Sequence, residues 1–238
     1  MKKNLIYFLL AVVTYSGTMQ AQYSNRSFTS DMFRVDEYIK RQNKFVNYDD
    51  KDSYQGTPYN NENFLPGNIY KSDELLATNV AIRYNAVADE IEVKESLTTP
   101  DTEAKVLTKS PEIFVKIVND IYIFAPYKGG IEGGGYFQVV YEGNTVDLYK
   151  KLQKDFNPEK KATSTLTQDI PAKFSDEITY FLADKSGKFY EMPKSRNKKL
   201  KVFGKKKNEV KNYVKDNRLD INDEKDLMKA VKFYDGSM

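Results

Sequence analysis

Acidic side chains are the residues of this chain best suited to catalysis. The sequence contains no histidine and no cysteine, which excludes imidazole bases, thiol nucleophiles, disulfides and metal sites built on those residues. An enzyme built on this chain would need Asp or Glu pairs, Lys, Tyr or a bound cofactor, and the hydrolytic candidate is a carboxylate pair as in glycoside hydrolases. The candidates are Glu90, Glu92, Glu112 and Glu142. Glu90 and Glu92 also fit the water-facing side of a β-strand, and we favour that interpretation.

A run of lysines near the C-terminus is the second chemically distinctive feature. Residues 194–238 contain 14 Lys and Arg against 7 Asp and Glu, a balance of +7, whereas residues 22–193 have a balance of −6. Clustered exposed cations attract anionic surfaces. We therefore expect a partner-binding surface at Lys198, Lys205, Lys206 and Lys207, called the lysine set below. The alternative is a solvated helix face without a partner.

Two segments resemble ligand-binding loops but lack the residues that define them. The glycine-rich stretch 129–135 has no Gly-Lys-Ser/Thr ending and precedes a predicted strand, whereas a phosphate loop opens a helix. The acidic stretch 216–227 has Ile221 and Leu227 where a calcium loop needs glycine and glutamate. We therefore predict no metal and no cofactor.

Alternating apolar residues predict a β-hairpin at Val80–Lys94. On the first strand Val80, Ile82 and Tyr84 alternate with more polar residues, and on the second Ile91 and Val93 do so. A period of two places these residues on the core face and Arg83, Asn85, Glu90, Glu92 and Lys94 toward water.

Similar pairs of runs follow along the chain. They are Glu112–Val118 with Ile121–Ala125, Tyr136–Tyr141 with Thr145–Leu152, and Glu177–Ala183 with Lys188–Met192. Asn68–Lys71 is a further strand, while Pro66-Gly67 predicts a turn and Leu97–Ser110 a loop. The pattern predicts a mainly β (α+β) fold, with an antiparallel hairpin meander over residues 56–193 that forms a barrel or a sandwich.

Helical patterns are confined to the two ends of the mature chain. In residues 22–55 we expect one short helix at Thr29–Gln42. In residues 194–238 we expect a pair of amphipathic helices packed on the β domain, with Asn222 as the N-cap of the second. The first helix has a continuous apolar face if Gly204 is tolerated; otherwise this glycine divides it into two short helices.

The N-terminus has the order of a secretory signal peptide. Lys2 and Lys3 precede the apolar run Leu5–Val13, and Ala21 provides a small residue at the cleavage site. We predict that residues 1–21 are removed on export and that no transmembrane span remains. The periplasm is the favoured location, and the extracellular space is the alternative.

The chain also resembles a family of uncharacterised exported proteins from Bacteroidetes. The resemblance is carried by Gly56-Thr57-Pro58-Tyr59, Phe64, Gly67, Ile69-Tyr70, Ile82–Asn85, Glu90–Glu92, Asp226-Leu227 and Phe233-Tyr234. It implies a location in the envelope of a Gram-negative cell and implies no activity.

These observations together favour a non-catalytic exported module for binding or envelope assembly. Its partner would be an envelope protein or an anionic lipid surface, and export argues against nucleic acid. The alternative is a carboxylate-based hydrolase that acts on envelope glycans.

Overall fold

A single, mostly antiparallel sheet dominates the protein. The computed structural model describes residues 38–40, 54–126, 134–164, 166 and 168–238, which contain a 12-stranded sheet. In sheet order, eleven strands are β1 (Ile39–Lys40), β6 (Lys105–Leu107), β5 (Glu90–Lys94), β4 (Glu74–Asn85), β3 (Leu65–Lys71), β7 (Ile113–Ile117), β8 (Asp120–Ala125), β9 (Gly135–Glu142), β10 (Val146–Asn157), β11 (Ala172–Asp184) and β12 (Phe189–Met192). The remaining strand, β2 (Tyr54–Gln55), pairs in parallel with the start of β11.

The predicted hairpins are confirmed, and so is the mainly β class. β4 pairs with β5, β7 with β8, β9 with β10, and β11 with β12, all antiparallel.

Two local predictions are wrong. Pro66 and Gly67 lie inside β3, where irregular register beside Gly67 accommodates a proline. The expected loop at Leu97–Ser110 contains β6, because Val106 and Leu107 are buried beside β5.

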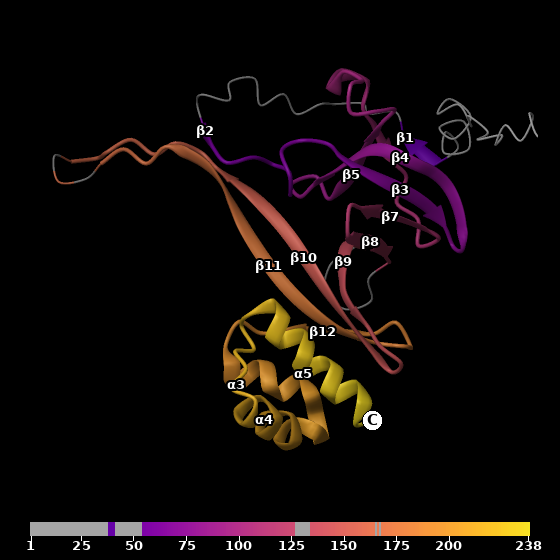
Figure 1. Cartoon of the computed structure of the whole chain (residues 1–238). Coiled ribbons are helices and arrows are strands. Elements are labelled where there is room, and N and C mark those ends of the chain that lie inside the picture. Colours follow the sequence, from indigo (N-terminus) through magenta and orange to yellow (C-terminus); the bar gives the residue numbers. More distant parts are fainter. Residues whose placement is uncertain (1–37, 41–53, 127–133, 165, 167) are drawn as a thin grey trace, which may run out of the picture.

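The expected fold was a barrel or a sandwich, but the sheet curls without closing into a barrel, and the described residues form no second sheet that would make a sandwich. β1 and β12 are the two ends of the strand order and do not pair. Opposite parts of the curl meet where the Lys154 N–H of β10 donates to the Ala86 carbonyl, 3.2 Å away. Beyond this contact β10 and β11 leave the body of the sheet as a two-stranded ribbon (Figure 1), so no continuous ladder completes the ring.

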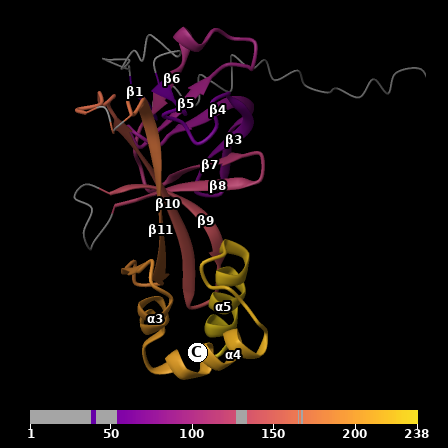
Figure 2. The same ribbon diagram turned by 90° about the vertical axis from the view of Figure 1, so that its left-hand side faces the viewer.

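The two largest hydrophobic clusters of the described residues lie at opposite ends of the molecule. The first fills the curl of β3–β9 and includes Ile69, Ile82 and Tyr136. The second lies between the C-terminal helices and the part of the ribbon where β10 begins and β11 ends. It includes Leu148 and Phe203. Figure 2 shows the helices at one end, the β3–β8 region at the other, and β10–β11 running between them.

The C-terminal region is divided at Gly204, as the second of our two alternatives predicts. Its elements are α3 (Arg196–Lys199), the 3-10 helix η4 (Leu200–Lys206), α4 (Lys207–Asp216) and α5 (Glu224–Gly236). Gly204 has φ 53° and ψ −124°, a conformation that favours glycine and ends helical geometry. The cap prediction is wrong by one residue: Asp223, not Asn222, caps α5 by accepting a hydrogen bond from the Asp226 N–H.

Several predictions concern residues outside the described part of the chain. The signal peptide lies there entirely, as does most of the expected helix at Thr29–Gln42. Ile39 and Lys40 form β1 and pair with β6, so the helix prediction is wrong at these residues. None of the described helices is long and apolar enough to cross a membrane.

Candidate functional site

The β4–β5 hairpin carries a buried cluster of charges on the face that we expected to meet water. Arg83, Glu92 and Lys94 are only 7%, 1% and 5% exposed. Arg83 donates to the Glu92 carboxylate at 2.6 and 3.2 Å. Asp101 lies 3.4 Å from Arg83 and 2.8 Å from Lys94. The prediction of a solvated face is therefore wrong at these three positions.

Side chains from outside the hairpin explain the burial. The Arg83 guanidinium lies 3.5 Å from the centre of the Tyr59 ring and 4.1 Å from that of Phe64, so aromatic rings cover its faces. Its remaining nitrogen donates to the Glu62 carbonyl at 3.0 Å. Lys94 donates to the Thr99 carbonyl at 2.6 Å. The cluster thus holds residues 59–64 and 97–101 against the hairpin. Each of its charged side chains forms an ion pair with another member of the cluster.

A second buried cluster joins the β4–β5 turn to β9 and β10. The Asp89 carboxylate accepts hydrogen bonds from Lys151 at 2.5 Å, from the Tyr84 hydroxyl at 2.8 Å and from the Tyr136 N–H at 3.2 Å. Lys151 also donates to the Tyr136 carbonyl at 3.0 Å. A Cβ atom at Gly135 would lie 2.6 Å from the Lys151 ammonium and 2.7 Å from the Asp89 carboxylate, so a larger residue here would have to displace this ion pair. The cluster ties together the two sides of the curl.

Electrostatics indicate a structural role for this second cluster. Burial lowers the pKa of Lys151, and the Asp89 carboxylate opposes that shift. Burial and the Asp89 charge raise the pKa of Tyr84 far above its usual range, so Tyr84 acts as a neutral donor. Lys151 is 2% exposed, and a substrate cannot reach its amine.

A third carboxylate fastens the last helix to the sheet. Asp235 of α5 accepts hydrogen bonds from the backbone N–H groups of Asn144, Thr145 and Val146 at 2.9, 2.7 and 3.1 Å. The hydroxyls of Thr145 and Tyr141 donate to it as well. Burial alone would raise the pKa of Asp235, but these hydrogen bonds outweigh it and hold the pKa far below the usual range.

We expect Asp235→Asn to lower the free energy of unfolding at pH 7 by about 1.5–3 kcal/mol, because the variant loses charge-assisted hydrogen bonds. A carboxyl with a lowered folded-state pKa stabilises the fold above its unfolded pKa, here 3.8, and loses that contribution as the pH falls through the folded value. The difference between wild type and variant should therefore shrink below about pH 4. Urea unfolding across pH measures it.

The control for this experiment is Asp216→Asn, which changes an exposed aspartate at the end of α4. Its effect at pH 7 should stay within about 0.5 kcal/mol. An equal loss in both variants, or a difference that is independent of pH, would contradict the role assigned to Asp235.

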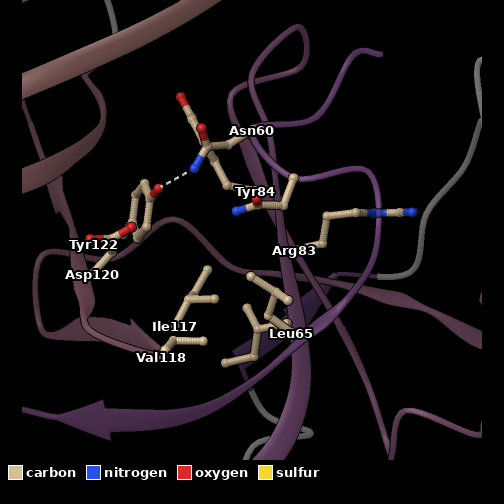
Figure 3. Close-up of a pocket in the computed structure, with 10 residues that line it drawn as sticks. Asn60, Leu65, Arg83, Tyr84, Ile117, Val118, Asp120 and Tyr122 are labelled. Atoms are coloured by element: carbon tan, nitrogen blue, oxygen red, sulfur yellow. Dashed lines mark hydrogen bonds between the residues drawn. The ribbon is translucent and has the colours of Figure 1, made fainter. Parts of the chain in front are cut away.

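A small pocket lies between the β7–β8 turn and residues 60–61, beside β3 and β4 (Figure 3). Its volume is about 50 Å³, far below the roughly 300–1,000 Å³ of typical ligand sites. Asn60 donates to the Tyr122 hydroxyl across it at 2.9 Å. Figure 3 shows the Arg83 side chain extending away from the other lining residues. The pocket has room for water and not for a substrate.

The four glutamates proposed for glycan hydrolysis occupy different environments. Glu92 is buried and bound to Arg83. Glu90 lies at the start of β5, Glu142 at the far end of β9, and Glu112 just before β7 with 61% of its side chain exposed. Within the described residues, Glu92 cannot serve as a catalytic carboxylate, because the buried ion pair closes it to a substrate.

The lysine set surrounds the break at Gly204. Lys198 on α3 and Lys205 on η4 are exposed, while Lys206 and Lys207 are half-buried. Lys206 forms an ion pair with Glu209 at 3.0 Å. The lysines do not share one continuous helix face, because the chain changes direction at Gly204. Lys199, between them in sequence, is buried and donates to the Ile221 carbonyl at 2.9 Å.

The sequence contained a signal for one of the buried clusters but not for the other. Arg83 and Glu92 are directly opposite in the β4–β5 register, so the hairpin pattern already paired their charges. Asp89 and Lys151 are far apart in sequence, and no local pattern connects them.

Comparison with known proteins adds no assignment to this geometry. Among the described residues, no group of three or more acidic side chains is placed to hold a metal ion. No protein-family model, curated protein or solved structure matches this chain.

Proposed function

We propose that the protein is a non-catalytic, exported binding module that docks on an anionic envelope surface through the lysine set. The observation that carries the proposal is the position of these cations. Lys205, Lys206 and Lys207 cluster at the start of α4, whose N-terminus has no side-chain cap. Cations at this end oppose the helix dipole, so their clustering does not serve the stability of the helix.

An anionic partner would relieve this unfavourable arrangement. Lys198, Lys205 and Lys207 have no acidic partner within ion-pair distance among the described residues, and Lys206 has only the exposed Glu209. Exposed like charges repel one another at low salt, and an anionic surface nearby lowers their energy. The roles of the buried charges in the fold also support a non-catalytic function, because they leave Glu92, Asp89 and Lys151 unavailable for chemistry.

The test compares the chain from Gln22 onward with the variant Lys198→Gln/Lys205→Gln/Lys206→Gln/Lys207→Gln. Each lysine near an anionic membrane contributes about 1 kcal/mol. Allowing for the Lys206 ion pair, we expect binding to phosphatidylglycerol vesicles at low salt to weaken on the order of a hundredfold. Vesicle co-sedimentation measures the affinity.

The matched control changes four exposed lysines elsewhere: Lys116, Lys160, Lys173 and Lys188. It alters the net charge equally and should keep most of the affinity. Equal loss in both variants would mean that total charge, and not the lysine set, governs binding. Wild-type binding to a purified acidic envelope protein but not to vesicles would replace the lipid by a protein as the partner.

A further inference from the structure

The β9–β10 turn holds a buried carboxylate without the help of a basic side chain. Asp235 is 6% exposed, and among the described residues no lysine or arginine lies within ion-pair distance of it. Consecutive N–H groups that converge on one point form an anion-binding concavity. Five neutral donors surround this charge and are called the anion cradle below: the N–H groups of Asn144, Thr145 and Val146 and the hydroxyls of Thr145 and Tyr141.

The anion cradle is shaped for both oxygens of one carboxylate. Three of its donors meet Oδ1 of Asp235 at 2.5, 2.7 and 3.1 Å, and two meet Oδ2 at 2.9 and 3.1 Å. Gly143 permits this close approach, because a Cβ atom there would lie 2.6 Å from the Asp235 Oδ2. The turn therefore wraps around the carboxylate group itself.

This carboxylate serves the turn and not the helix that carries it. Asp235 is the penultimate residue of α5, where a negative charge opposes the helix dipole. The helix also has other attachments: Glu224 near its start bonds to Lys150 and to the Tyr180 hydroxyl, both at 2.9 Å, and Val231 is buried in the second hydrophobic cluster. Removal of the Asp235 carboxylate should therefore leave α5 in place and the anion cradle empty.

We propose that the anion cradle is a binding site for small carboxylates, that Asp235 is its tethered ligand, and that the site binds a free formate ion once this carboxylate is removed. Formate has the size of the group that Asp235→Ala deletes, and its two oxygens can take the positions of Oδ1 and Oδ2. A spherical anion such as chloride cannot occupy both positions at once.

The test is urea unfolding of Asp235→Ala at pH 7 in sodium formate and, at equal ionic strength, in sodium chloride. Formate has three non-hydrogen atoms and can bind no more tightly than about 0.5 mM, so we expect half-saturation in the millimolar range. At ten times the half-saturating concentration, the unfolding equilibrium constant should be about tenfold lower than in chloride. Amide NMR should show saturable shifts at Asn144, Thr145 and Val146.

Two further variants show whether formate occupies the anion cradle. Asp235→Asn is the matched control, because its amide fills the same space, and formate should stabilise it no more than chloride does. The addition of Thr145→Val to Asp235→Ala removes one donor and should raise the half-saturating formate concentration about tenfold. If Asp235→Ala does not fold, Asp235→Ser takes its place, and formate should stabilise that variant relative to chloride.

Equal effects of formate and chloride on Asp235→Ala, or equal effects of formate on Asp235→Ala and Asp235→Asn, would overturn the proposal, because they would show a general action of the salt. Saturable shifts confined to residues outside the turn would also overturn it, as would a half-saturating concentration that Thr145→Val leaves unchanged. The wild-type protein should not respond to formate, since Asp235 fills the site.

Discussion

Replacing Glu92 by glutamine is expected to destabilise the protein by about 3–5 kcal/mol, the cost of breaking a buried ion pair by removing one partner. Arg83 is 7% exposed and would keep neutral acceptors, the amide oxygen at position 92 and the Glu62 carbonyl, but its remaining countercharge would be Asp101, whose side chain is 61% exposed. The loss should appear in urea unfolding as a lower midpoint with an unchanged slope.

The control for the Glu92 substitution is Glu112→Gln, which removes a carboxylate with a 61% exposed side chain and a weak 4.0 Å contact to Lys71. It should cost less than about 1 kcal/mol. The double variant Arg83→Met/Glu92→Met should be clearly more stable than the two single effects predict, because it leaves no unpaired buried charge. Additive losses would show that the two side chains do not act as a pair.

Replacing Lys151 by methionine is expected to cost about 1.5–3 kcal/mol, since the Asp89 carboxylate loses its charged donor. The consequence should concentrate where the curl is held together. Hydrogen exchange at Tyr136 and at the Lys154 N–H, which bonds to Ala86, should accelerate more than exchange in α5.

Lys109→Met is the control for Lys151, because Lys109 lies farther from the same carboxylate, at 3.8 Å, and is 30% exposed. Its loss should cost at most about 1 kcal/mol. In the background Asp89→Asn, which suits the positive φ of 54° at this residue, Lys151→Met should cost less than in wild type. An unchanged cost would show that Lys151 does not act through Asp89.

Local periodicity was sufficient to predict the hairpins. Val80, Ile82 and Tyr84 alternate over one strand and Ile91 and Val93 over the next, and turn residues separate the two. The strand β6 escaped prediction because it is only three residues long and lies between turn-forming residues. Its strand geometry depends on pairing with β5 and not on its own pattern.

Local sequence patterns did not determine the burial of Glu92, the opening of the sheet or the helix break at Gly204. The first two depend on contacts between distant segments. Glu92 is buried because Arg83 is covered by Tyr59 and Phe64, which the alternation of β5 cannot indicate. The sheet stays open because β10 meets Ala86 through one backbone hydrogen bond and not through a ladder, and this contact joins residues that are far apart in sequence. At Gly204 both helical arrangements placed the same apolar residues inward, so only the backbone conformation could distinguish them.

The ionic-strength dependence of membrane association tests the central claim of this account most directly. Electrostatic docking should be strong on phosphatidylglycerol vesicles near 0.01 M salt, where the screening length is about 30 Å, and should largely disappear by 0.15 M, where it is about 8 Å. Phosphatidylcholine vesicles should bind little of the protein at any salt concentration. Equal, salt-independent association with both lipids would contradict docking through the lysine set.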